Sequence, residues 1–326
     1  MDIPQKLLAV LYALAAFAVV VGLILVVATW TERRRPRAVA WWFLAPTFAL
    51  LAVGLVWPAL RTIWLSFFGP DGSGFVGLRN YGTIFTSSED LVVLRNTVLW
   101  TLVTPFVATA IGLVYAVLVD GARGESFSKA LIFLPMAISL VGASIIWKFM
   151  YDFKSLDAGT KAHPPQQIGL LNQIIVWLGG HPYDFLLNSP LNTFFLIAVM
   201  IWIQAGFAMT ILSASIKAIP VDVVEAARLD GVSRVQMFRF VTLPTIRPAV
   251  VVVLTTIAIA CLKVFDVVRT MTGGNFGTDV IANEFFTQSF SAANYGLGAA
   301  LAVLLFVLVI PIVVYNVRQM RASEAR

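Results

Sequence analysis

The stretch EAARLDGVSRVQMFRFVTLPTIRP, residues Glu225 to Pro248, places polar and basic residues between two long apolar runs. A segment this polar is too costly to bury in lipid, so it must lie in water beside a membrane. There another protein can reach it. The apolar runs on either side decide the fold, and the segment between them decides what can dock.

The whole chain has the composition of a membrane protein. Of its 326 residues, 59% are hydrophobic and 12% are charged, against about 25% charged in soluble domains. Loops rich in Lys and Arg on one side of a membrane explain the net charge of +6, so no nucleic-acid partner is expected. The single cysteine, Cys261, lies in an apolar run, which excludes an intramolecular disulfide.

Seven segments are long and apolar enough to be transmembrane helices, which need about 20 residues each. They are Leu7–Thr29, Val39–Phe67, Leu91–Val119, Phe127–Tyr151, Leu191–Ile216, Ile246–Met271 and Tyr295–Val317. The first is expected to be an anchor, because its apolar run is longer than that of a signal peptide. The predicted fold class is an all-α polytopic membrane protein with seven transmembrane helices.

Basic residues predict the orientation of these helices. Four regions on one side of the membrane carry most of the Lys and Arg: Arg33, Arg34, Arg35 and Arg37; Arg123 and Lys129; Lys217, Arg228, Arg234, Arg239 and Arg247; and Arg318, Arg321 and Arg326. Positive residues stay inside, so we expect the N-terminus outside and the C-terminus in the cytoplasm. In the external loop Asp152–Pro190, the amphipathic run Ile168–Leu178 is expected to form a helix on the outer surface.

Residues 220–248 carry the signals of two short helices. Gly231 can take the left-handed conformation that ends the first. Ser233 with Gln236 forms a capping box that opens the second, and Pro244 is expected to stop it. A passive loop stabilised by its own caps is the alternative, but a segment so well defined at both ends favours a docking element.

The same stretch resembles the signature loop of the permease subunits of ATP-binding-cassette importers. The family pattern is EAA, three residues, Gly, and later a hydrophobic residue with Leu-Pro. The matching residues, with Asp230 just before the glycine, are Glu225, Ala226, Ala227, Gly231, Leu243 and Pro244. The resemblance implies that the first helix couples the chain to a separate ATPase subunit.

Further motifs resemble the carbohydrate-importer branch of this family, the maltose-permease type. In chain order they are Phe75–Tyr81, Asn96-Thr97, Phe133–Pro135 with Trp147, Ile201–Phe207, Ile219-Pro220, Phe265-Asp266 and Met271–Gly274. Asn275 stands where the family often has Pro after two glycines. This variant resembles permeases for α-glucosides, which implies maltose, trehalose, sucrose or a glucosylated compatible solute as substrate.

The resemblance implies a type I importer permease fold, a six-helix core plus one N-terminal helix. The expected parts are the extra helix and basic loop (1–37), the first core helix and external loop (38–91), the transmembrane domain (92–317) with its coupling loop (218–248), and a cytoplasmic tail (318–326). The implied partners are a second permease in a heterodimer, an ATPase dimer and an extracytoplasmic sugar-binding protein. The implied location is the bacterial inner membrane.

The chain lacks the motifs of an enzyme. It has no G-x-x-x-x-G-K-[ST] phosphate loop, no metal-ligand spacing and no catalytic constellation. We therefore expect no catalytic residues, no metal and no cofactor on this chain, with ATP and Mg on the partner ATPase. The alternatives are a stand-alone secondary transporter, for which no internal symmetry is evident, and a polytopic membrane enzyme.

Polar and aromatic residues inside the spans are candidates for the sugar path, because intramembrane polar groups are costly. Trp202, Gln204 and Phe207 lie in the fifth span, where interhelical packing is the alternative role. Lys263 and Asp266, with Arg269, are three apart near the outer end of the sixth span and should share one helix face. They form either a polar lining or a self-neutralising ladder.

Overall fold

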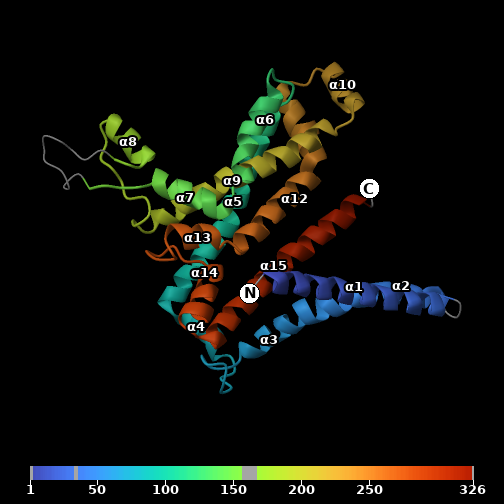
Figure 1. The fold of residues 1–326 in the computed structure, drawn as a ribbon. Helices are drawn as coiled ribbons and strands as arrows, with labels where there is room; N and C mark the ends of the chain where they lie inside the picture. The colour runs from blue at the N-terminus through green and yellow to red at the C-terminus, as the bar shows by residue number, and fades with distance from the viewer. Residues whose placement is uncertain (1–2, 33–35, 156–166, 325–326) are drawn as a thin grey trace. The chain divides into compact units, whose positions relative to one another are not determined.

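The computed structural model describes residues 3–32, 36–155 and 167–324, which are almost entirely helical (Figure 1). Within these ranges, an isolated antiparallel bridge between Phe68 and Phe75 is the only β pairing. The chain divides into two compact units, Met1–Trp64 and Leu65–Arg326. The all-α fold class predicted from the sequence is confirmed.

The first unit is a pair of helices. It contains α1 (Ile3–Glu32) and α2 (Pro36–Leu51), which pack on each other, then a π-helical segment (Ala52–Val56) and most of α3 (Trp57–Leu65). Trp41–Leu65 is long and apolar enough to cross a membrane. The predicted span Leu7–Thr29 lies within α1, where the apolar part that the structure describes, Ala18–Val27, is shorter than a span. The count of seven spans therefore stays a prediction.

The second unit is built on three long helices. These are α5 (Ser88–Val119), α9 (Leu191–Lys217) and α15 (Tyr295–Glu324), and each is long and apolar enough to span a membrane, as is the helical stretch Arg234–Leu262. The shorter elements α4 (Arg79–Thr86), α13 (Asp266–Met271), α14 (Ile281–Phe286) and a π segment (Thr287–Ser291) lie near their ends.

The predicted span Phe127–Tyr151 is not one straight helix. It is a pair, α6 (Glu125–Phe133), continued by a 3₁₀ turn (Leu134–Ala137), and α7 (Leu140–Met150), bent by 99°. Pro135 in the 3₁₀ turn has no N–H for an α-helical bond, which explains the break. The Ser139 hydroxyl then accepts a hydrogen bond from the Gly142 N–H at 3.1 Å and restarts the helix as α7.

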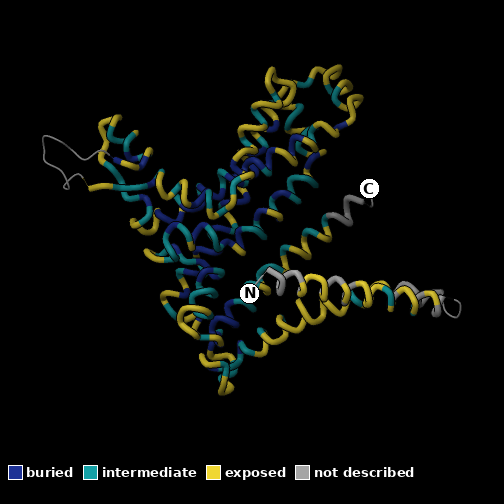
Figure 2. The backbone as a smooth tube through the Cα atoms, viewed as in Figure 1, coloured by how far each residue is buried: buried dark blue, intermediate teal, exposed yellow. Residues whose placement is uncertain are grey.

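The core lies where α5, α9 and α12 (Leu243–Leu262) meet (Figure 2). Its largest fully buried side chains include Trp100 of α5, Met209 of α9 and Ile257 of α12. A Cβ on Gly206 of α9 would lie 2.4 Å from the Ile132 carbonyl oxygen of α6, so only glycine permits this approach. The close packing makes these helices one unit.

The sequence motif Phe75–Tyr81 has a structural role at one end of this unit. The Asn80 side-chain amide donates to the carbonyl oxygens of Ser66 and Phe68, both at 2.8 Å. The Tyr81 hydroxyl donates to the Ser66 hydroxyl at 2.8 Å. The motif therefore holds the loop after α3 against the start of α4.

Candidate functional site

Residues Pro220–Thr242, which include most of the Glu225–Pro248 stretch, form a helical hairpin that we call the Gly231 hairpin. Pro220 occupies the N-cap position of α10 (Val221–Leu229). Gly231 follows with φ of 76°, a conformation that L residues rarely adopt, and no heavy atom lies within 4 Å of where its Cβ would be. The left-handed turn predicted at Gly231 is confirmed.

The capping box predicted from Ser233 and Gln236 is confirmed at the start of α11 (Arg234–Gln236). The Gln236 side-chain oxygen accepts from the Ser233 N–H at 2.7 Å. The Ser233 hydroxyl accepts from the Gln236 N–H at 3.3 Å. Two reciprocal bonds fix where the second arm of the hairpin begins.

The prediction that Pro244 stops this second helix is wrong. The chain passes from α11 through a π-helical segment, η4 (Met237–Thr242), directly into α12, and Arg234–Leu262 forms one membrane-length helix. Pro244 lies in the first turn of α12. The π segment shifts the hydrogen-bond register before the proline, so its missing N–H does not end the helix. The hairpin is thus continuous with a spanning helix.

The outer side of the hairpin is a free surface in this chain. None of the residues of α10 is buried. Glu225 and Ala226 are exposed, and Leu229 is 89% exposed although it is apolar. Figure 2 shows α10 coloured almost wholly as exposed. An exposed acidic and apolar helix at the end of a membrane unit is suited to docking another protein.

The inner side of the hairpin faces a cavity of about 430 Å³. Asp120, just after α5, and the arginines Arg228 and Arg234 contribute charges to its wall. The remaining lining residues are Val117, Ile216, Val232, Met237, Phe238 and Thr242. The cavity lies between the hairpin and the ends of α5 and α9, while Val224 of α10 packs against the core.

An ion-pair network at the base of the hairpin was not predicted from the sequence. Glu125, the first residue of α6, pairs with Lys129 at 2.5 Å and with Lys217, the last residue of α9. Lys129 also donates to the Ser213 hydroxyl of α9. The spacing of Glu125 and Lys129 is visible in the sequence, but Lys217 is brought to them only by the fold. The network ties α6 to the helix that leads into the hairpin.

The sugar-path candidates on α9 are half-buried. Trp202 and Phe207 pack against the core, and the Trp202 ring meets the Trp147 ring edge-on at 5.6 Å between centroids. Gln204 is half-buried, and among the described residues nothing hydrogen-bonds to its side-chain amide. A polar group left unpaired in this position is available to a polar ligand.

The structure separates Lys263 from Asp266, which were expected to share one helix face. Helix α12 ends at Leu262, and α13 begins at Asp266, so the sixth span is broken between them. The ion pairs in the described residues all involve Glu125, so no self-neutralising ladder forms here. The Arg269 guanidinium instead stacks 4.8 Å from the Phe286 ring centroid. Lys263 is exposed at the break.

Two asparagines hold the loop between α13 and α14, residues 272–280. The Asn96 amide donates to the carbonyl oxygens of Gly277 and Asp279 at 2.7 and 2.9 Å. The Asn192 amide donates to the Phe276 carbonyl oxygen at 2.9 Å. Asn96 was singled out only as part of a motif that resembles the family, and the role of Asn192 was not predicted. Together they fasten the loop to α5 and α9.

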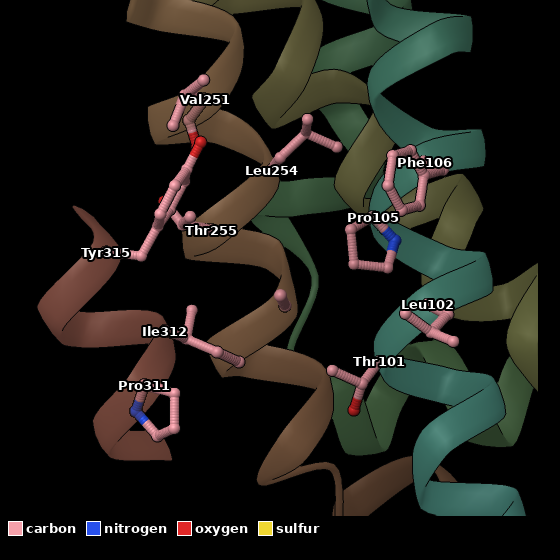
Figure 3. A pocket seen from close by; sticks show the side chains of 11 residues that line it. Thr101, Leu102, Pro105, Phe106, Val251, Leu254, Thr255, Pro311, Ile312 and Tyr315 are labelled. Atoms are coloured by element: carbon pink, nitrogen blue, oxygen red, sulfur yellow. The ribbon is translucent and has the colours of Figure 1, made fainter. Parts of the chain in front are cut away.

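A groove of about 440 Å³ lies between α5, α12 and α15 (Figure 3). Its wall is mostly apolar side chains, with hydroxyls from Thr101, Thr255 and Tyr315. The Thr101 hydroxyl already donates to the Thr97 carbonyl oxygen, and the Thr255 hydroxyl to that of Val251. None of the sugar-path candidates lines it, so this groove suits apolar packing better than sugar.

A family model described as a binding-protein-dependent transport system inner membrane component matches residues 92–321, more than half of the chain. The chain belongs to this family. This permease is therefore an inner-membrane component of a binding-protein-dependent transport system. Its membership of the family disfavours the two alternatives, a membrane enzyme and a stand-alone secondary transporter.

The curated relatives of the permease are named as permease proteins of transport systems. The osmoprotective compounds uptake permease protein GgtC of Synechocystis is 46% identical, covering 86% of this chain and 99% of the relative. The alpha-glucoside transport system permease protein AglF of Rhizobium meliloti is 44% identical, covering 85% and 81%. The trehalose/maltose permease protein MalF of Thermococcus litoralis is 29% identical, covering 85% and 91%. The names describe permease proteins for osmoprotective compounds, for alpha-glucosides, and for trehalose and maltose.

The fold also matches solved transporters. A bacterial ABC transporter involved in alginate import is similar, with a TM-score of 0.74 and 22% identity, covering 89% of this chain and 99% of that one. The same type of transporter in complex with an alginate-bound periplasmic protein gives a TM-score of 0.72 and 21% identity, covering 87% and 95%. At these identities the match establishes the fold, which is that of a type I importer permease.

Proposed function

We propose that the permease is one half of the membrane channel of an ATP-driven importer for α-glucosides or a glucosylated compatible solute. The observation that carries the proposal is the Gly231 hairpin, an exposed element that turns at a glycine and joins two membrane-length helices. The names of the two relatives above 40% identity, for α-glucosides and osmoprotective compounds, support the substrate class.

In this proposal the hairpin residues Glu225, Ala226, Ala227, Asp230 and Gly231 dock α10 against the ATPase subunit, while Leu243 and Pro244 join the hairpin to α12. The exposure of α10 and the cavity behind it support a movable docking element. ATP with its Mg binds the ATPase, so no catalytic residue, metal or cofactor is needed on this chain.

The two arms of the hairpin lead to the proposed sugar path. One arm joins α9, which carries Trp202, Gln204 and Phe207; the other runs through α12 to the break beside Lys263 and Asp266. Both α12 and α13 pack against α9. A displacement of α10 would therefore move both proposed walls of the path together, which suits alternating access by rigid-body motion.

Membership of the family suggests two further partners besides the ATPase. A second permease would complete the path as a heterodimer, and an extracytoplasmic sugar-binding protein would deliver substrate from outside. The basic loops support an external N-terminus and a cytoplasmic C-terminus, with the hairpin in the cytoplasm.

Uptake by the reconstituted complex tests the proposal. Permease, partner permease and ATPase are placed in liposomes with internal ATP, and the binding protein is added outside with labelled maltose, trehalose, sucrose or a glucosylated solute. We expect ATP-dependent uptake of at least one glucoside. Uptake of none of them, with uptake of another solute class by the same vesicles, would contradict the assigned substrate class.

A further inference from the structure

Helix α8 (Leu170–Trp177) turns a row of apolar side chains outward. Leu170, Ile174, Trp177 and Leu178 follow the spacing of one helix face and are 46%, 37%, 73% and 82% exposed. The outward face of a surface helix in water normally carries polar residues. Something other than water therefore covers this row in the working protein.

The inward face of α8 fixes its orientation. The fully buried Asn172 amide donates to the carbonyl oxygens of Asp152 and Tyr183 at 2.8 and 3.0 Å. Its side-chain oxygen accepts from the Tyr183 N–H at 2.7 Å. Leu171 and Ile175 pack against the core. Since these contacts occupy the inner face, the helix cannot turn to hide its outer row.

The same contacts fix the position of α8 relative to the end of α7. Asp152 lies two residues after the end of α7, and α7 with α6 forms a bent pair that is long and apolar enough to be one span. A Cβ on Gly169 would lie 2.2 Å from the Asp152 carbonyl oxygen, so the start of α8 is pressed against this point. The segment lies before α9, and the Gly231 hairpin follows the other end of α9. It thus lies where the chain leaves the membrane, opposite the hairpin.

Composition indicates what covers the outer row. Residues 167–180 contain no Asp, Glu, Lys or Arg, whereas the rim of a protein interface is polar. Aliphatic side chains with a tryptophan at the end of the row match the membrane–water interface, where indole rings are enriched. Leu178, directly after the helix, continues the row, and Ile168, just before it, is 61% exposed.

We propose that α8 lies in the interface of the leaflet opposite the hairpin, with Ile174, Trp177 and Leu178 among the lipid headgroups and upper acyl chains. Asn172 transmits this anchoring to the end of α7. The bent helix pair is thereby braced against the bilayer at its far end. The inference needs membrane insertion of the chain but does not depend on which solute is transported.

Depth-dependent quenching tests the proposal on the reconstituted complex. Leu178→Cys and Ile174→Cys are made in a Cys261→Ala background, labelled with bimane, and exposed to headgroup-nitroxide lipid or to aqueous iodide. Ser73→Cys, in the exposed loop after α3, is the matched polar control. The Cys261→Ala complex without a new cysteine gives the labelling background.

We expect quenching by the nitroxide lipid to be several-fold stronger at Leu178→Cys and Ile174→Cys than at Ser73→Cys, with weaker iodide quenching and no change when the binding protein is added. Iodide quenching equal to that of Ser73→Cys would place the row in water and overturn the proposal. Protection from both quenchers would mean that a protein covers the row, which also overturns it. Quenching needs no transport, so either failure would leave the importer assignment standing.

Discussion

At the scale of single residues, Asp279 carries an unusual carboxyl group in the loop held by Asn96 and Asn192. Its Oδ1 accepts from the Val280 N–H at 2.7 Å and from the Asn283 amide at 2.8 Å. Burial raises the pKa of the Asp279 carboxyl from 3.8 to about 7, and Glu284 nearby adds to the rise. The folded loop therefore favours the neutral acid.

This pKa predicts a pH dependence of stability with a definite sign. Between about pH 4 and pH 7 the folded state binds more protons at Asp279 than the unfolded state, so stability falls as pH rises through this window and levels off above it. Asp279→Asn should flatten the dependence and raise Tm at pH 8 relative to the wild type. Since one pKa unit corresponds to about 1.36 kcal/mol, the unfolding free energy gained by the variant at pH 8 is at most about 4 kcal/mol.

Thermal unfolding of the purified permease from pH 5 to pH 8 checks this. Asp71→Asn is the control: hydrogen bonds from Ser73 lower the pKa of the Asp71 carboxyl, so its contribution is lost only in more acid solution. Equal pH profiles for Asp279→Asn and the wild type would contradict the assignment.

Gln204 makes a second residue-scale prediction. If its amide binds sugar hydroxyls, Gln204→Leu should lower kcat/KM for uptake about tenfold, on the order expected for one lost polar contact. Thr210→Val on the same helix is the control, because the Thr210 hydroxyl already donates to the Gly206 carbonyl oxygen. Unchanged uptake by Gln204→Leu would assign this residue to packing.

At the scale of elements, the Glu125 network joins α6 to the end of α9. Glu125→Gln removes the charge that holds Lys129 and Lys217, so we expect weaker transmission from the hairpin and several-fold slower uptake, with assembly intact. Wild-type uptake should fall with rising salt more steeply than that of the variant, because salt screens exposed pairs. Uptake rates over a salt series check this, and parallel salt curves would argue against a coupling role.

Elements that depend on residues a few positions apart were predictable from the sequence. Elements that depend on the hydrogen-bond register of a helix, or on contacts between distant parts of the chain, were not. The Ser233–Gln236 capping box and the Gly231 turn depend on residues a few positions apart, and both were confirmed. The prediction that a helix stops at Pro244 was wrong, because a π segment precedes the proline and the helix continues through it.

Breaks within helices and contacts between residues far apart in the chain were also not predictable from the sequence. A 3₁₀ turn bends the predicted span Phe127–Tyr151, and the break before Asp266 separates that residue from Lys263. Neither break has a strong signal in hydropathy. The pairing of Glu125 with Lys217 and the binding of Phe276 by Asn192 depend on helix packing, which no local pattern encodes.

At the scale of the whole molecule, the second of the two units has the Gly231 hairpin at one end of α9 and the 272–280 loop at the other. The proposal that energy enters through the hairpin depends on α10 meeting an ATPase subunit. A substitution that disturbs the hairpin should therefore uncouple transport without unfolding the core, because no residue of α10 is buried.

Gly231→Asp, compared with Gly74→Asp, tests this most directly. Both glycines have positive φ, 76° and 67°, and open space where a Cβ would be, so the backbone strain is matched. In the reconstituted complex we expect Gly231→Asp to insert normally but to lose sugar uptake and sugar-stimulated ATP hydrolysis, whereas Gly74→Asp keeps both. Retention of uptake and ATPase stimulation by Gly231→Asp would contradict coupling through the hairpin.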